Sequence, residues 1–313
     1  MQIFQGQVRF GIHRGPQDTG FEEYLGLWRR AEQLGYDWAS VFDHFVPIYS
    51  DPEGPCLEGL TLLSALAAHT SRIRCGILVA GNTYRHPTVL ANIAATIDHV
   101  AGGRLELGVG AGWFEDEHRQ YGIPFPPTAT RIRMLGESLQ ILTSLWASQR
   151  TSFEGRHYQL RDALCEPKPL QRPRPPLWVG GAGEQLTLRV VAQSADGWNT
   201  FLMAPEDYRH KLDVLAGHCK AVGRDPDDIR KSLIYRAVVR EDPAEAERSP
   251  AAARLRQRDP AALVGTPEQL TETLAAFLPL GVGDFLLGQA GPVDDETVEL
   301  VATRVAPELR AAR

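Results

Sequence analysis

Short apolar runs alternate with helix-like patterns along nearly the whole chain, and this alternation restricts the fold more than any other feature. We expect strands at residues 8–12, 38–42, 74–80, 105–109, 177–179, 197–200, 233–239 and 285–287. Between them, apolar residues such as Leu135, Leu139 and Leu142 recur three and four positions apart, as in an amphipathic helix. Eight strand–helix units predict an α/β protein with a single closed (β/α)8 TIM barrel over residues 1–313.

The stretch from about 150 to 176 interrupts this rhythm. Residues 152–160 are expected to form a small hairpin, and the proline-rich residues 166–176 a connector that cannot hold a helix. We interpret this stretch as an insertion in the barrel. Insertions are expected at the C-terminal rim, where the active sites of such barrels lie.

Charge and cysteine usage exclude several classes of protein. The 313 residues include 39 acidic and 33 basic ones, a net charge of −6 that disfavours a nucleic-acid partner. The four cysteines form no CxxC pair, which disfavours a zinc site and a disulfide scaffold. The first residues lack a basic stretch followed by an apolar core, and no apolar run is long enough to cross a bilayer. We therefore expect a soluble, cytoplasmic protein with no membrane partner.

The first candidate for chemistry is Asp43-His44, directly after the second expected strand. A residue just past a barrel strand points into the mouth, where a histidine can move protons near neutral pH. The adjacent aspartate can hydrogen-bond a cofactor ring or orient a loop. The alternative is that Asp43 caps a local turn and His44 packs on the rim.

Two glycine-rich turns follow the fourth and fifth expected strands. In the first, Gly108-Val109-Gly110-Ala111-Gly112-Trp113, glycines allow close backbone approach and Trp113 could form a wall beside an aromatic ring. The alternative is a tight turn with a core tryptophan. In the second, Val179-Gly180-Gly181-Ala182-Gly183-Glu184, a helix start near Glu184 would offer free N–H groups to a phosphate, although such turns are common. Asn82, which follows the third strand, can also reach the rim.

The acidic cluster Glu115-Asp116-Glu117-His118 could indicate a metal site. Residues so close in sequence cannot all converge on one ion, so we interpret the cluster as a charged, solvated helical face and expect no metal.

Together these segments resemble the bacterial luciferase-like monooxygenase superfamily, and within it the oxidoreductases that use the deazaflavin coenzyme F-420. The resemblance runs from about Arg9 to Gln289. It is carried by the order and spacing of short stretches: AEQLGYD at 31–37, FDHF at 42–45, GGRLELGVG at 102–110, PKP at 167–169, PPLWVGG at 175–181, ADGWN at 195–199 and VGTPE at 264–268.

The resemblance implies a TIM barrel, usually a homodimer, with a flavin-like ring across the C-terminal mouth. Asp43 and His44 would lie against the ring. A bulge near Leu78-Val79, often with a non-proline cis peptide, would support its other face. Gly110, Ala111 and Gly112 would line the path of the ribityl and phosphate groups, and Gly180, Gly181 and Ala182 would bind the phosphate. Asn82 and Trp113 are expected to bind the cofactor because of their places after the third and fourth strands.

The function expected from this resemblance is hydride transfer between a small organic substrate and C5 of coenzyme F-420, an 8-hydroxy-5-deazaflavin. His44 would donate or accept the accompanying proton. One alternative is an FMN-dependent monooxygenase supplied with reduced flavin by a partner reductase. Another is a non-catalytic barrel that binds flavin or a phosphorylated ligand.

The sequence also bears on the substrate. The related sugar-phosphate dehydrogenases carry an acid where this chain has Trp113 and a tryptophan where it has Ile48, which argues against a glucose-phosphate substrate. The expected rim segments, 48–57, 113–131 and 200–205, mix aromatic and apolar residues with few charges, which favours an uncharged or apolar molecule.

Overall fold

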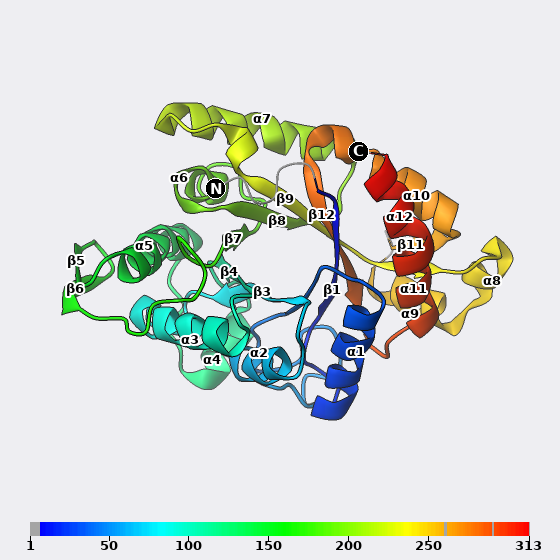
Figure 1. The fold of residues 1–313 in the computed structure, drawn as a ribbon, viewed down its shortest axis with the longest axis horizontal. Helices are drawn as coiled ribbons and strands as arrows, with labels where there is room; N and C mark the ends of the chain where they lie inside the picture. Colours follow the sequence, from blue (N-terminus) through cyan, green and yellow to red (C-terminus); the bar gives the residue numbers. More distant parts are fainter. Residues whose placement is uncertain (1–6, 260–261, 290, 313) are drawn as a thin grey trace.

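The computed structural model describes residues 7–259, 262–289 and 291–312. The first six residues, on which the expectation of no leader segment mainly rests, lie outside this range. Within it, eight parallel strands close into a barrel in the order β1-β12-β9-β8-β7-β4-β3-β2, with helices around them (Figure 1). The strands are β1 (Arg9–Arg14), β2 (Trp38–Val41), β3 (Arg74–Gly81), β4 (Leu105–Gly110), β7 (Leu177–Gly180), β8 (Gly197–Phe201), β9 (Arg230–Tyr235) and β12 (Val282–Gln289). The predicted TIM barrel is confirmed.

The helices form a ring because each packs an apolar stripe against the strands. They are α1 (Phe21–Gln33), α2 (Gly59–Ala68), α3 (Pro87–Val100), α5 (Thr128–Ala147), α6 (Thr187–Ser194), α7 (Pro205–Val222), α10 (Pro267–Ala275), α11 (Asp295–Leu300) and α12 (Ala306–Ala311). Short helical turns lie at η1 (Pro226–Asp228), η2 (Leu278–Leu280) and η3 (Val301–Val305). No helix in the described ranges has the length and apolar character that a bilayer crossing requires.

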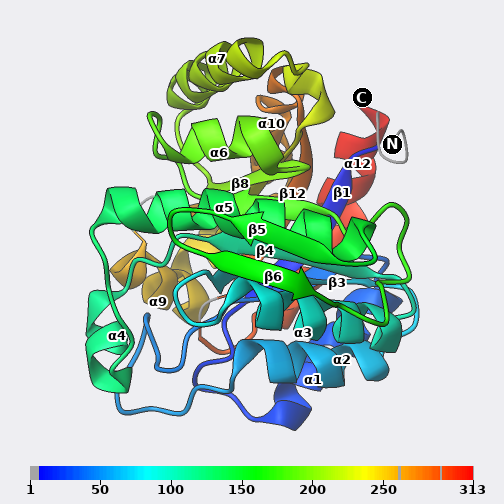
Figure 2. The ribbon, with the colours of Figure 1, turned by 90° about the vertical axis from the view of Figure 1, so that its left-hand side faces the viewer.

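Further short helices lie beside the barrel mouth. These are α4 (Glu115–Tyr121), α8 (Pro243–Arg248) and α9 (Pro250–Arg258). Figure 2 shows α4 and α9 together at one end of the barrel, with the end of α12 at the other. The first of these ends is the C-terminal mouth, because α4 directly follows β4.

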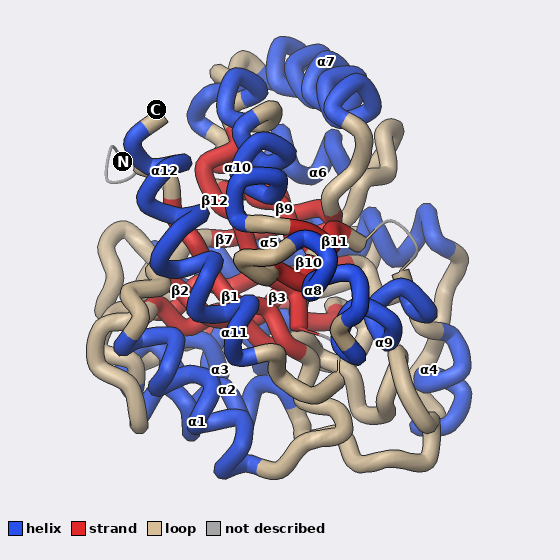
Figure 3. The backbone as a smooth tube through the Cα atoms, turned by 90° about the vertical axis from the view of Figure 1, so that its right-hand side faces the viewer, coloured by secondary structure: helices blue, strands red, loops and turns tan. Residues whose placement is uncertain are grey.

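The expected seventh strand is in fact two strands. The barrel strand β9 ends at Tyr235, and β10 (Ala237–Val239) then leaves the barrel to pair with β11 (Leu263–Gly265). Figure 3 shows this small sheet beside α8 and α9. The segment from 233 to 239 is apolar on both sides of Arg236, and both parts are buried, so it has the pattern of one strand although the break lies at this arginine.

The expected hairpin is confirmed as β5 (Thr151–Glu154) paired antiparallel with β6 (Gln159–Ala163). Its tip reaches the mouth, where the Tyr158 hydroxyl accepts a hydrogen bond from Asn82 Nδ2 at 3.3 Å. The proline-rich connector, residues 166–176, does not lie at the rim where the insertion was expected. Gln171 bonds to Arg74 at the start of β3, so the connector lies at the opposite, N-terminal end. It must return there because it leads into the start of β7.

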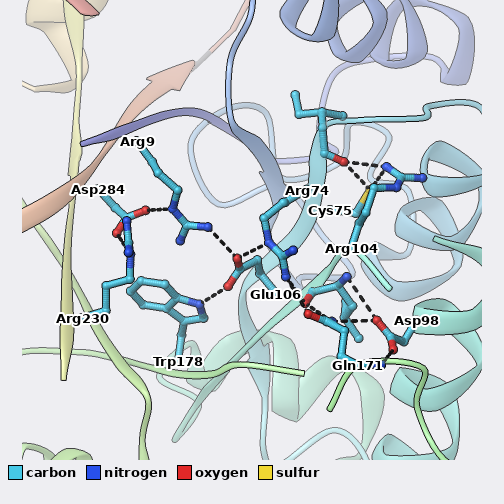
Figure 4. Close-up of polar contacts among 12 residues, drawn as sticks. Arg9, Arg74, Cys75, Asp98, Arg104, Glu106, Gln171, Trp178, Arg230 and Asp284 are labelled. Carbon is cyan, nitrogen blue, oxygen red and sulfur yellow. Dashed lines mark hydrogen bonds and ion pairs between the residues drawn. The ribbon is translucent and has the colours of Figure 1, made fainter. Parts of the chain in front are cut away.

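A buried network of charges closes this N-terminal end (Figure 4). Arg9 donates to Asp284 at 2.6 Å and to Glu106 at 2.8 Å, and the Trp178 indole donates to Glu106 at 2.7 Å. Arg74 also pairs with Glu106, at 2.5 Å. Burial alone would raise the pKa of Glu106, but Arg9 and Arg74 outweigh it and hold the pKa at about 2. The carboxylate therefore stays ionised inside the barrel.

We expect Glu106→Gln to reduce the free energy of unfolding by about 3–5 kcal/mol, because it leaves buried guanidinium charge without its counter-ion. Urea denaturation measures the change. As a control, Asp116→Asn removes an exposed pair with Arg119 and should cost under about 0.5 kcal/mol. Equal losses in the two variants would contradict the structural role of Glu106.

The same variant carries a pH signature. The pKa of Glu106 is about 2 in the folded protein, below the value of about 4.3 for an unfolded glutamate. Its contribution is therefore fully present above about pH 4.3 and is lost as the pH falls toward 2. The difference in stability between the wild type and Glu106→Gln should shrink over that interval.

Candidate active site at the mouth of the barrel

His44 lies just past β2 in an aromatic enclosure at the C-terminal mouth. Its side chain is 10% exposed. The rings of Phe42, Trp113 and Phe114 meet the imidazole edge-on, with centroids 5.0, 5.8 and 6.0 Å away. Of these, Trp113 is 61% exposed, so it forms an outer wall beside the histidine rather than part of the core.

One buried carboxylate fixes the orientation of His44. Glu117 Oε2 lies 2.9 Å from His44 Nδ1, and Glu117 also accepts from the Tyr84 hydroxyl and from the backbone N–H groups of Phe45 and Val46. Burial would raise the pKa of Glu117, but the hydrogen bonds from His44 and Tyr84 outweigh it and lower the pKa. An ionised carboxylate can only accept, so Nδ1 of His44 carries its proton. In the neutral ring, Nε2 is then an acceptor, and it has no hydrogen-bond partner among the described residues.

The expectation that residues 115–118 form a solvated face is wrong for Glu117 and His118, which are both fully buried. His118 Nε2 lies 2.7 Å from the Thr83 hydroxyl, and its Nδ1 lies 2.7 Å from the carbonyl of Phe114. Sequence reasoning therefore missed Glu117. The positions 114, 117, 118 and 121 follow helical spacing and include two aromatic residues, a pattern that places Glu117 and His118 on the inward face.

Asp43 connects the ends of two neighbouring strands. It is buried, and it accepts from the Gly81 N–H at 2.8 Å and from Arg85 at 2.6 and 3.0 Å. Burial raises its pKa, against the opposing effect of Arg85. Both carboxylate oxygens are already in use, which favours the loop-orienting role considered for Asp43. Contact with a cofactor stays a prediction.

The expected bulge in the third strand is confirmed. The Leu78–Val79 peptide is cis, and the pairing of β3 with β4 shifts register between Ile77 and Ala80. Leu78 is buried, whereas Val79 is half-buried at the centre of the mouth.

Three of the glycines in the two glycine-rich turns surround Val79. A Cβ at Gly108 or Gly180 would lie 2.9 or 2.8 Å from its side chain, and one at Gly110 would lie closer still. Glycine is therefore needed at these positions to make room for the bulge. The result is an apolar shelf at Val79 that neighbouring side chains cover only in part.

The loop after β4 is held firmly. Gly112 has φ +78°, and a Cβ there would meet the Thr83 hydroxyl at 2.6 Å. Arg131 Nε donates to the Gly112 carbonyl at 3.2 Å, and the Asn82 N–H donates to the Gly110 carbonyl at 2.9 Å. Ala111, between them, is half-buried. This places Asn82 and the whole segment from Gly110 to Trp113 at the mouth.

The second glycine turn departs from its expectation. Helix α6 begins only at Thr187, so Gly180, Gly181 and Ala182 do not lie at a helix N-terminus. The Gly181 N–H donates to the carbonyl of Asn199 at 3.1 Å and is already engaged. The indole N–H of Trp198 on β8 donates to the Gly181 carbonyl at 2.7 Å. This bond keeps the turn beside β8, in line with the end of β7. Phosphate binding here stays a prediction, without the support of a helix terminus.

The mouth therefore combines a histidine of fixed tautomer, an exposed tryptophan and a partly covered apolar shelf. Such a surface suits a flat ring placed next to a proton-transferring group. Among the described residues, no group of three or more His, Cys, Asp and Glu side chains gathers as a metal site requires.

Comparison with known proteins places these features in a family. An F-420-dependent glucose-6-phosphate dehydrogenase from Microbacterium testaceum is 33% identical over 225 residues, covering 71% of this chain and 66%, just under two thirds, of the relative. An FMNH(2)-dependent dimethylsulfone monooxygenase from Pseudomonas putida is 26% identical, covering 90% of this chain and 85% of its own.

The structural match extends further along the chain than the first of these sequence matches. The coenzyme F-420-dependent tetrahydromethanopterin reductase of Methanopyrus kandleri superposes with a TM-score of 0.80 at 21% identity, covering 97% of this chain and 99% of that one. At that identity the match shows a shared fold. The profile of the family described as luciferase-like monooxygenase matches residues 5–258. The chain therefore belongs to the luciferase-like monooxygenase family.

Proposed function

We propose that this protein is an oxidoreductase that transfers a hydride between a small organic substrate and coenzyme F-420. The observation that carries the proposal is the His44–Glu117 pair, with Nδ1 and Oε2 2.9 Å apart, at the barrel mouth where β3 also carries the bulge at Val79. A hydride that leaves a carbon bearing a hydroxyl must be accompanied by loss of the hydroxyl proton. His44 Nε2 offers an acceptor for that proton, next to a surface that suits a flat ring.

Each residue of the site has a distinct part in this proposal. His44 accepts the hydroxyl proton at Nε2 when the substrate is oxidised and returns it in the reverse direction. Glu117 keeps the other ring proton on Nδ1 and balances the positive charge that forms on the imidazole. Leu78 and Val79 support the ring, and the segment from Gly110 to Gly112 borders the path of its ribityl and phosphate groups. The chemistry that F-420 supplies when bound is acceptance or release of a hydride at C5.

The relatives support this choice of cofactor. The Microbacterium protein, at 33% identity, is an F-420-dependent dehydrogenase. FMN is the second candidate, because the Pseudomonas relative, which matches more of the chain, depends on FMNH(2). An FMN enzyme of this type would receive reduced flavin from a reductase and consume oxygen.

A side-by-side fluorescence titration with F-420 and FMN tests the cofactor directly. We expect F-420 to bind at least about tenfold more tightly than FMN, a difference of about 1.4 kcal/mol. Oxygen uptake with reduced FMN serves as the second measurement. Absence of F-420 binding would overturn the proposal, and oxygen uptake by the FMN-loaded protein would favour the monooxygenase.

The variant His44→Ala tests the catalytic role. We expect F-420 affinity to stay within about threefold of the wild type while turnover falls about 10²–10⁴-fold, the usual range for loss of a general acid–base group. Turnover is followed by the loss of absorbance of oxidised F-420 during a screen of alcohols. Unchanged turnover would remove His44 from the mechanism, while a protein that binds F-420 with no activity on any alcohol would favour a carrier role.

Glu117→Gln tests whether Glu117 acts through His44. We expect turnover to fall by about 10²-fold, because the Nδ1 proton of His44 loses the carboxylate that fixes it, while F-420 affinity stays within about threefold of the wild type. Glu115→Gln, on the exposed face of the same helix, is the matched control and should keep both turnover and F-420 affinity. A loss of F-420 affinity as large as the loss of turnover would assign Glu117 a purely structural role.

A further inference from the structure

A small cavity at the mouth lies close to the His44 site. Phe42 lines it and also packs edge-on against His44, with ring centroids 5.0 Å apart. The cavity is bordered by the ends of β1, β9 and β12 and has a volume of about 30 Å³. The described residues that line it include two arginines, Arg14 and Arg236, and no acid. Each arginine also pairs with a carboxylate outside the lining, Arg14 with Glu23 at 2.8 Å and Arg236 with Asp259 at 3.2 Å, so what the cavity offers an anion is the N–H groups that these pairs leave free.

Arg14 has unused hydrogen-bonding capacity. It is 3% exposed, and its Nη2 donates to Glu23 at 2.8 Å and to the Gly291 carbonyl at 3.3 Å. Its Nη1 is buried and has no hydrogen-bond partner among the described residues. A buried, unpaired N–H of a charged group is costly, so it calls for a partner. Arg14 is one of the residues that border the cavity, so a ligand bound there lies next to this guanidinium.

Arg236 faces the same cavity from the end of β9. Its guanidinium lies over the rings of Tyr49 and Phe201, at 5.0 and 5.5 Å from their centroids. Stacking uses the faces of the guanidinium and leaves its in-plane N–H groups available. One nitrogen already donates to Asp259 at 3.2 Å, which leaves others for a ligand.

The third polar neighbour, His13, is uncharged at neutral pH. Burial and the charge of Arg236 lower its pKa to about 3. Its Nδ1 lies 3.0 Å from the Ser40 hydroxyl. The positive charge at the cavity therefore comes from the two arginines alone.

We propose that this cavity is a subsite for a carboxylate of the organic substrate, bound by Arg14 and Arg236. The proposal rests on the proposed function and names its substrate class as hydroxy acids and the corresponding oxo acids. The volume of the cavity favours a carboxylate over a phosphate. A volume of about 15 Å³ holds one water-sized group. The 30 Å³ of this cavity therefore suits the two oxygens of a carboxylate and is small for the three free oxygens of a phosphate. Arginine also matches a carboxylate in geometry.

The reaction of such a substrate is oxidation of a hydroxy acid to an oxo acid. The carbinol C–H bond breaks and its electron pair passes as hydride to C5 of F-420, while the hydroxyl O–H bond breaks and its proton passes to His44 Nε2. The carbinol becomes a carbonyl and the carboxylate is unchanged. Around the cavity the rim is aromatic, with Tyr49 37% and Phe201 50% exposed. The rest of the substrate is therefore apolar. The rim segments favoured an uncharged or apolar substrate, and the cavity changes this expectation to an apolar molecule with one carboxylate.

Ligand-observed NMR titration of the purified protein tests the subsite without turnover. The probes are lactate and mandelate, their neutral amides, and inorganic phosphate. We expect both carboxylates to bind saturably, and the amides and phosphate to bind at least about tenfold more weakly. Equal binding of the amides, tighter binding of phosphate, or no saturable binding of either carboxylate would overturn the proposal.

Two variants locate the binding. Arg236→Gln should weaken carboxylate binding at least about tenfold, and Arg14→Lys, which keeps the charge but loses Nη1, should weaken it severalfold. Arg119→Gln, an exposed arginine on α4, is the matched control and should change nothing. Because Arg14 is buried, Arg236→Gln decides the outcome if Arg14→Lys does not fold, and unweakened binding in Arg236→Gln would refute the assignment.

F-420 titration of the same variants separates this inference from the proposed function. Arg236→Gln should keep F-420 affinity within about twofold of the wild type. A wild-type protein that binds the carboxylates but not F-420 would overturn the proposed function and leave the anion subsite standing. A protein that binds F-420 but not the carboxylates would do the opposite.

Discussion

A carboxylate buried in a protein must gather hydrogen-bond donors to remain ionised, and this requirement organises both ends of the barrel. At the N-terminal end, Glu106 draws Arg9, Arg74 and the Trp178 indole together from three other strands. At the mouth, Glu117 collects its donors from the loops that follow β2 and β3. Each carboxylate thus holds together segments far apart in the sequence, and Glu106 does so between β4 and β1, which are not neighbours in the sheet. At the mouth, the same contacts set the direction of a functional imidazole.

Much of the fold could be predicted because barrel strands are short, buried and regularly spaced. All eight barrel strands coincide with expected apolar runs, and the bulge at Leu78-Val79 lies where the family resemblance implies. The errors have physical causes. The expected seventh strand joined two buried apolar segments across Arg236, which is the point where the chain leaves the barrel, because a single charged residue does not by itself end a strand. A glycine turn does not show how far away the next helix starts, as Thr187 illustrates.

The site was harder to predict than the fold because its key interaction depends on tertiary contacts. His44 is evident from its place after a strand, but Glu117 belongs to a run of charges whose usual place is the surface. Its burial is stabilised only by donors that the fold brings from elsewhere, in particular Tyr84 and the backbone after His44. Likewise, the glycines around Val79 resemble a ligand cradle in sequence, yet the structure uses them to accommodate a side chain. Neither outcome can be read from local spacing alone.

Two histidines near the mouth, His13 and His44, differ in their surroundings because a positive charge lies near one and a negative charge near the other. His13 lies near the Arg236 charge, and burial together with that charge keeps its pKa at about 3, so it cannot take up a proton at neutral pH. His44 Nδ1 lies 2.9 Å from Glu117 Oε2, which leaves Nε2 as the acceptor of the ring. Phe42 lines the cavity beside Arg14 and Arg236 and also packs edge-on against His44. A substrate with a carboxylate and a neighbouring hydroxyl therefore meets opposite fields at its two polar ends. Its carboxylate is drawn to the arginines, and its hydroxyl is left facing the only one of the two imidazoles able to accept a proton.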